Sequence, residues 1–156
     1  MKITGLDHIG FTVADIERSA DWYTFFLGES PLLRDVWDVE YVGRMLGYPG
    51  CKMECAYWRL PNGARLELIQ YYEPPTGIVD MECYNVGNGH LCLSIEDLDA
   101  VYERLSGRAE FRHAEPVSIP WGPYKGGKAC YLRDPDGISI QLMQYPAGAH
   151  TPAMEA

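Results

Sequence analysis

The chain has 156 residues and a formal net charge of −9, with 22 acidic against 13 basic side chains. Nucleic acids are bound through basic patches that neutralise phosphates, so this composition excludes a nucleic-acid partner. The 47% apolar and 12% aromatic content is that of a globular protein, and no apolar run reaches membrane-spanning length. The opening MKITGLDHIG lacks the apolar core of a signal peptide. We therefore expect a cytoplasmic protein whose five cysteines are reduced and mostly buried, with no membrane partner.

The first half of the chain begins with a strand and a helix. Residues 8–13 alternate between polar or small and apolar side chains, a period of two that predicts a strand with two different faces. Asp15 fits a helix N-cap, and the apolar spacing that follows predicts a helix over 16–28 that ends at Gly28. Two or three strands follow, and a turn at 61–63 predicts a hairpin between the last two.

The segment 35–53 of the first half has no counterpart later in the chain. Its sequence predicts an inserted loop with a short helix, which could form a lid over a cavity. Trp37 could stack on a flat ligand, although aromatic residues more often pack in a core. Arg44 could contact an acidic substrate group. The segment 72–88, rich in Pro and Gly, is typical of a linker between two halves.

The second half repeats the order of elements. Residues 90–95 alternate as the first strand does, Asp97 fits an N-cap, and the following residues predict a helix over 98–107. Further strands follow, with a hairpin turn at 135–137. Each half therefore reads β-α-β-β-β, which predicts an α+β fold built from two βαβββ modules.

A Gly-rich loop at 121–128 precedes a strand of the second half. It could cover a site, where Trp121 and Tyr124 could stack on a ligand. Lys125 or Lys128 could meet an anionic substrate group such as a carboxylate. A plain surface turn explains the same residues equally well.

The two halves also resemble each other residue by residue. AYWRLPNGARLELIQY at 56–71 aligns with CYLRDPDGISIQLMQY at 130–145, and this places Glu67 on Gln141. The starts of the two halves align as well, and there His8 falls on His90. Two copies of one supersecondary unit, each with a histidine at its start and a carboxylate or amide at its end, can build one shared site.

The residue types at these four positions suggest a metal. A single histidine near a strand start is more often a structural residue, but chance does not place four ligand-capable side chains at equivalent positions. Two imidazoles, one carboxylate and one amide oxygen suit a divalent transition metal ion with positions left for water or substrate. We expect one such ion, nickel, zinc, cobalt, manganese or iron.

The motifs LDHIGFTVADIERSADWYTFFLG, GHLCLSIEDLDAVYERL and YLRDPDGISIQL resemble those of the vicinal oxygen chelate superfamily. This group includes glyoxalase I, methylmalonyl-CoA epimerase, extradiol dioxygenases and bleomycin resistance proteins. The resemblance covers residues 3–146. It implies a single domain at 1–147 made of modules at about 3–72 and 88–146, which form an open barrel around a metal, often in a homodimer. Residues 148–156 would be a flexible tail.

The resemblance assigns the metal ligands to His8, Glu67, His90 and Gln141. In glyoxalase I and in the epimerase, the position that matches Gln141 is usually Glu, which in glyoxalase I is thought to act as the base. Here Glu67 is the only carboxylate of the four. We therefore expect a glyoxalase-like lyase or isomerase in which Glu67 moves the proton of an enediolate-type reaction on a small substrate that is chelated through neighbouring oxygens.

Two alternatives remain open. An extradiol-type dioxygenase would bind ferrous iron through His8, His90 and Glu67, the inventory of a facial triad. A drug- or metabolite-binding resistance protein would use the aromatic side chains to hold a flat ligand without chemistry. Proteins of that kind lack the metal ligands, which this chain keeps.

Overall fold

A computed structural model describes residues 1–148 of the chain. The tail expected at 148–156 lies, from residue 149 onward, outside the described residues. The chain forms two compact units, Met1–Val79 and a second that begins at Asp80. Each unit contains one open β-sheet, and neither sheet closes into a barrel by itself. The expected α+β class is therefore confirmed, because each unit combines an open sheet with helices.

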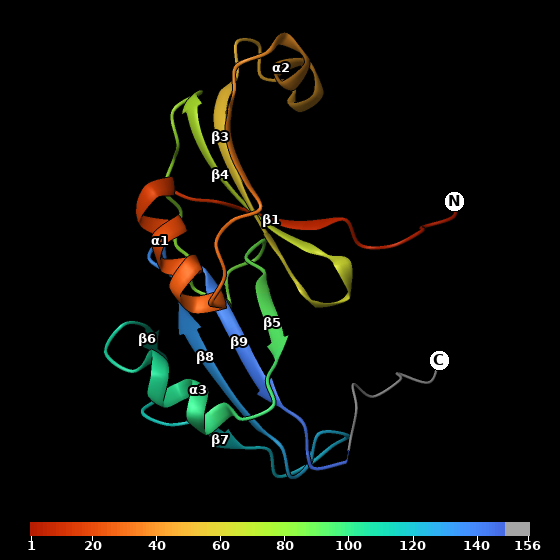
Figure 1. The fold of residues 1–156 in the computed structure, drawn as a ribbon, viewed down its shortest axis with the longest axis vertical. Coiled ribbons are helices and arrows are strands. Elements are labelled where there is room, and N and C mark those ends of the chain that lie inside the picture. Colours follow the sequence, from red (N-terminus) through yellow and green to blue (C-terminus); the bar gives the residue numbers. More distant parts are fainter. Residues whose placement is uncertain (149–156) are drawn as a thin grey trace. The chain divides into compact units, whose positions relative to one another are not determined.

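The first unit follows the predicted β-α-β-β-β order with one added helix (Figure 1). Its elements are β1 (His8–Thr12), α1 (Ile16–Leu27), β2 (Leu33–Trp37), α2 (Glu40–Leu46), β3 (Lys52–Arg59), a 3-10 turn η1 (Pro61–Gly63) and β4 (Arg65–Glu73). The strand order is β1-β4-β3-β2, in which only β1 and β4 run parallel. The predicted short helix of the insertion is α2, and it lies where β2 ends and β3 begins (Figure 1).

The second unit has the same arrangement around its two long strands. Its elements are β5 (His90–Ser94), α3 (Leu98–Leu105), β6 (Glu110–Phe111), β7 (Val117–Ser118), β8 (Lys128–Arg133) and β9 (Ser139–Gln144). The strand order is β5-β9-β8-β6, and β7 also pairs with β8. As in the first unit, the first and last strands, β5 and β9, are the parallel pair.

The helix ends follow the predicted capping residues. The carboxylate of Asp15 accepts from the backbone N–H of Arg18, and the carboxylate of Asp97 accepts from that of Ala100, both at 3.0 Å. Helix α1 ends at the left-handed Gly28, as predicted. Helix α3 ends at Leu105, two residues before the expected Gly107.

Two glutamines that the repeat places on each other attach the helices to the sheets. The side-chain oxygen of Gln70 in β4 accepts from the first backbone N–H of α1, at Ile16, at 2.8 Å. Gln144 in β9 does the same for α3 at Leu98, also at 2.8 Å. Each bond satisfies a helix N–H that has no partner within its own helix. The repeat therefore preserves the hydrogen bond between helix and sheet as well as the pairing of the strands.

Each helix covers one face of its sheet, and the apolar core lies between them. In the first unit the ring of Tyr23 on α1 packs 6.1 Å from that of Trp58, next to the fully buried Leu66 and Leu68. In the second unit the corresponding buried residues are Leu132, Ile140 and Leu142. The histidines and their neighbours are left on the opposite face of each sheet.

The inserted helix packs on that opposite face of the first sheet. Val42 of α2 is fully buried and forms a cluster with Cys51, Met53 and Cys55, and Trp37 packs against this cluster. The segment expected as a lid is thus folded, and its helix shares an apolar cluster with β3. All five cysteines are free, and Cys51, Cys55 and Cys130 are buried.

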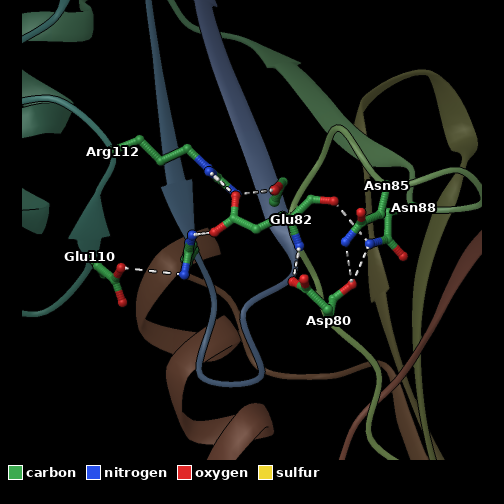
Figure 2. A network of polar contacts seen from close by, with 8 residues as sticks. Asp80, Glu82, Asn85, Asn88, Glu110 and Arg112 are labelled. Atoms are coloured by element: carbon green, nitrogen blue, oxygen red, sulfur yellow. Dashed lines mark hydrogen bonds and ion pairs between the residues drawn. The ribbon is translucent and has the colours of Figure 1, made fainter.

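The expected linker at 72–88 is divided between strand and loop. Strand β4 includes Tyr72 and Glu73, whereas residues from Asp80 onward attach to the second sheet. Figure 2 shows the carboxylate of Glu82 facing Arg112, whose Nη1 lies 2.8 Å from Oε2.

Glu82 is held by a second arginine, and its backbone is tied into the loop. Its other carboxylate oxygen accepts from Arg133. The backbone carbonyls of Asp80 and Glu82 accept from the side-chain amide of Asn88 (Figure 2). The two arginine contacts fix the loop 80–88 to β8 and to the residue that follows β6, and the Asn88 contacts hold the loop together.

No helix among residues 1–148 combines the length and apolarity that crossing a membrane requires.

Replacing Glu82 by Gln should release this loop, because the substitution removes the negative charge that attracts the guanidinium groups of Arg112 and Arg133. We expect severalfold faster hydrogen exchange at the backbone amides of Asn85 and Asn88, measured by NMR or mass spectrometry, and unchanged exchange in α3. Glu110→Gln is the matched control, because Glu110 contacts Arg133 only at 3.7 Å and is largely exposed. Equal exchange in wild type and Glu82→Gln would show that the ion pairs do not hold the loop.

Candidate metal-binding pairs

The parallel register of β1 and β4 brings His8 and Glu67 together. Gly10 lies opposite Glu67, so the side chains of His8 and Glu67 are on the same face of the sheet. The Nε2 atom of His8 lies 3.2 Å from Oε2 of Glu67. Glu67 is buried, with 6% of its surface exposed, whereas His8 is half exposed. The site thus offers a buried carboxylate beside an accessible imidazole.

The other nitrogen of His8 is already occupied. Nδ1 lies 2.8 Å from Oδ1 of Asp7, which also accepts from Arg65 at 2.5 Å. The hydrogen bonds from His8 and Arg65 lower the pKa of Asp7. A carboxylate at Nδ1 favours the tautomer that carries its proton there, as in histidines that bind metals through Nε2. Nε2 of His8 and Oε2 of Glu67 are then two acceptors facing each other, which a cation between them would satisfy.

Two neutral side chains of β3, Tyr57 and Cys55, lie beside the Glu67 carboxylate as hydrogen-bond donors. The hydroxyl of Tyr57, directly opposite on that strand, donates to Oε1. Burial and the neighbouring Glu67 charge raise the pKa of Tyr57, and they raise that of the Cys55 thiol to about 12. Both side chains therefore keep their protons at neutral pH.

The second unit repeats this arrangement with an amide in place of the carboxylate. Cys92 lies opposite Gln141, and Nε2 of His90 is 3.1 Å from Oε1 of Gln141. The Tyr131 hydroxyl donates to the same amide oxygen at 2.9 Å and lies 3.3 Å from Nε2 of His90. Burial raises the pKa of Tyr131 as it does that of Tyr57.

Sequence reasoning missed the two tyrosines. Tyr57 and Tyr131 fall on each other in the repeat, next to the start of each aligned segment. That signal was visible, but a tyrosine is a weaker metal ligand than the histidines and glutamate, and its partner depends on the antiparallel register of the hairpin.

The separation of the two atoms in each pair fits two ligands of one metal ion as well as a direct polar contact. Ligand atoms about 2.1 Å from a divalent ion and at right angles to each other lie about 3 Å apart. The measured separations of 3.2 Å and 3.1 Å match this value, and the donors are nitrogen and oxygen atoms suited to a transition metal. Within residues 1–148, no three side chains of His, Cys, Asp or Glu gather closely enough to hold an ion. Each pair by itself thus provides two of the expected ligands.

The two candidate substrate residues of the insertion have different surroundings. Trp37 is partly buried against the cluster around Val42 and has a packing role. Arg44, on α2, lines a pocket of about 340 Å³ together with other residues of the same insertion. The rest of the lining is Asp38, Val39, Glu40, Gly43, Gly47, Pro49, Gly50 and Cys51. Arg44 therefore lies where it could meet a small molecule.

The candidates on the second unit's loop lie in a hydrogen-bonded turn. The backbone of Ile119 bonds to that of Gly127 and of Gly126 at 2.9 and 3.0 Å. Trp121 is 77% exposed, and Tyr124 packs its ring 5.7 Å from that of Tyr145. Lys125 is exposed as well. The structure brings none of these side chains into a contact with His90 or Gln141 within the described residues.

A substitution at Gly10 can test how closely the Glu67 carboxylate approaches β1. A Cβ atom at Gly10 would lie 3.1 Å from Oε2 of Glu67, which is tighter than ordinary contact. Gly10→Ala should therefore displace the carboxylate from His8 while the fold is kept. We expect the imidazole resonances of His8 to shift in NMR spectra and those of His90 to stay unchanged. Cys92→Ala, at the matching position of the second unit, is the control, and unshifted His8 resonances in Gly10→Ala would contradict the described contact.

Comparison with known proteins agrees with the repeat and the fold. Residues 5–142 match the model of the Glyoxalase/Bleomycin resistance protein/Dioxygenase superfamily. The chain is 27% identical over 146 residues to a 2-epi-5-epi-valiolone epimerase of an Actinomyces species, covering 91% of this chain and 80% of that protein. It is 30% identical over 141 residues to a probable lactoylglutathione lyase of Vibrio cholerae, covering 88% of each.

Among solved structures, a glyoxalase family protein from Bacillus cereus matches with a TM-score of 0.78. The match covers 94% of this chain and 97% of that one at 24% sequence identity, so it bears on the fold alone. With the family match over most of its length and two histidine-centred pairs at equivalent positions, the chain belongs to the Glyoxalase/Bleomycin resistance protein/Dioxygenase superfamily, the vicinal oxygen chelate group.

Proposed function

We propose that this protein is a metal-dependent lyase or isomerase of the glyoxalase type, acting on a small substrate that chelates a metal through neighbouring oxygens. One observation carries the proposal: the same histidine-to-oxygen contact occurs at the same register in both units, 3.2 Å from His8 to Glu67 and 3.1 Å from His90 to Gln141. In each unit the repeat keeps a histidine and an oxygen-bearing side chain at this contact, two residue types that ligate metal ions.

The two pairs supply the ligands of one divalent metal ion in this proposal. Two histidine nitrogens, one carboxylate oxygen and one amide oxygen leave coordination positions for substrate oxygens. Nickel, zinc, cobalt, manganese and iron all accept this donor set. When bound, the ion supplies Lewis acidity that polarises a substrate carbonyl and makes the adjacent C–H more acidic.

Glu67 is the group that moves the proton. It is the only carboxylate among the four ligand residues. The amide of Gln141 cannot act as the base, because it neither accepts nor releases a proton near neutral pH. The Glu67 carboxylate takes the proton from the carbon next to the carbonyl. In an isomerisation it returns the proton to the neighbouring carbon, whereas in an epimerisation a water molecule on the opposite face protonates the same carbon and Glu67 releases its proton to solvent. No atom is gained or lost, so the outcome is an isomerisation or epimerisation.

The relatives support this class of chemistry. One is named as an epimerase and several as lactoylglutathione lyases, and neither of the two relatives described above is named as a dioxygenase. Two activities should therefore be assayed first: lactoylglutathione lyase activity and the epimerisation of 2-epi-5-epi-valiolone. The extradiol dioxygenase has the right ligand inventory in His8, His90 and Glu67, and oxygen consumption with catechols would favour it.

Substrate contacts and assembly complete the proposal. Arg44 would meet an acidic substrate group from its pocket on α2. Trp121, Tyr124 and Lys125 would contact the substrate from the loop of the second unit. Association into a homodimer is proposed from the family alone.

Replacing Glu67 by Gln tests the assigned base. The amide keeps the shape and one ligating oxygen but cannot carry a proton, so turnover should fall by about 100-fold or more while metal is partly retained. Turnover is measured in both assays, and metal content by elemental analysis of the same samples. Glu54→Gln is the matched control, because Glu54 is a buried carboxylate of the same unit that binds Arg34 and Tyr72 instead.

Unchanged turnover in Glu67→Gln would remove Glu67 from the mechanism. A wild-type protein that binds none of the five metals after reconstitution would overturn the metal-dependent function itself and leave the ligand-binding alternative.

A further inference from the structure

Two tyrosines occupy matched positions beside the proposed ligands. Tyr57 on β3 lies opposite Glu67, and Tyr131 on β8 lies opposite Gln141. In each unit the hydroxyl reaches across to the oxygen-bearing side chain on the neighbouring strand. The aligned sequences share this tyrosine although the residue opposite it changes from Glu to Gln. The duplicated contact therefore needs an explanation that covers both partners.

The amide of Gln141 has to be oriented before it can bind a metal. Its two ends have almost the same shape, but only Oε1 has lone pairs, whereas the NH2 group presents hydrogens. The structure has Oε1 beside His90, at 3.1 Å from Nε2, and the Tyr131 hydroxyl donates to that oxygen at 2.9 Å. A carbonyl oxygen has two lone pairs: one accepts from Tyr131, and the other faces Nε2 of His90, where a metal ion would take the place of the direct contact.

The carboxylate of Glu67 does not have this problem. Both of its oxygens are ligands, so either orientation offers an oxygen to His8. Tyr57 holds Oε1, and Oε2 is left 3.2 Å from Nε2 of His8. Tyr57 is therefore less important for orienting Glu67 than Tyr131 is for orienting Gln141.

We propose that Tyr131 is a positioning residue that selects the amide oxygen of Gln141 as a metal ligand, and that Tyr57 is its counterpart at Glu67. This inference rests on the proposed metal site. It goes beyond that site because it assigns a role to two hydroxyls that are not ligands and predicts that the role depends on whether the partner is an amide or a carboxylate.

The aromatic rings of both tyrosines have contacts of their own. The Tyr131 ring packs edge-on against His90, with 5.3 Å between centroids. The Tyr57 ring lies under the guanidinium of Arg65 at 5.5 Å and against the cluster around Val42. Substitution by Phe keeps these contacts and removes only the hydroxyl, so the variants should fold.

The test is a double-mutant cycle on the full chain, with Co²⁺ as the probe. Binding is measured by titration, and the visible absorption of the bound ion reports its ligand geometry. We expect Tyr131→Phe to weaken Co²⁺ binding by about 10- to 100-fold, the range typical of residues that orient metal ligands, and to change the spectrum. In a Gln141→Glu background the same substitution should have little effect, because a carboxylate presents an oxygen in either orientation.

The first unit offers the reverse cycle. Tyr57→Phe should weaken Co²⁺ binding more in a Glu67→Gln background than in the wild type. Tyr72→Phe is the matched control, since its hydroxyl donates to the carboxylate of Glu54 at 2.6 Å, outside the proposed site. It should leave Co²⁺ binding unchanged.

Three results would overturn the inference. Wild-type affinity and spectrum in Tyr131→Phe would show that the hydroxyl does not position Gln141. An equal loss in the wild-type and Gln141→Glu backgrounds would show a general structural role. A wild type that binds no Co²⁺ would remove the metal site and this inference together. By contrast, retained turnover in Glu67→Gln would overturn only the proposed reaction and leave the cobalt results standing.

Discussion

The parallel pairing of the first and last strands in each unit is the constraint on which the rest of the structure depends. It places Gly10 opposite Glu67 and Cys92 opposite Gln141, so the histidine two residues earlier faces the same side as the oxygen donor. A slip of one residue would turn Glu67 toward helix α1 and bury a charge in the apolar core. The same strands use their alternate residues to dock the helices, through Gln70 and Gln144. One register thus determines both the core and the candidate site.

The repeat preserves this scaffold and varies the groups attached to it. Glu67 becomes Gln141, Gly10 becomes Cys92, and the Asp7 that holds His8 is replaced by a glycine before His90. The donor pair of the first unit is therefore the charged one, with its imidazole oriented by a carboxylate. The second pair is neutral and is oriented by a tyrosine. In the proposed mechanism the first unit supplies the proton-transfer group and the second supplies only binding.

Much of the architecture could be predicted from the sequence. Period-two alternation gave the strand faces, and Asp15, Asp97 and Gly28 marked helix ends because their side chains or conformations do so locally. Comparing two copies of one pattern singled out His8 and Glu67 as candidate ligands, together with His90 and Gln141 at the equivalent positions. What could not be predicted depends on contacts between distant segments: the packing of α2 on the sheet, the attachment of Glu82 to Arg112 and Arg133, and the tyrosine hydroxyls. Periodicity reports which face a residue occupies but not which side chain it meets there.

Locating the bound metal ion tests the proposed function most directly. Crystals grown with cobalt, with data collected across the cobalt absorption edge, give the ion's position from its anomalous scattering. The proposed metal site predicts a single strong anomalous peak per chain, with bonding distances of about 2.0–2.2 Å to His8, Glu67, His90 and Gln141. An ion bound by only one of the two pairs, or no ion at these four side chains, would contradict it.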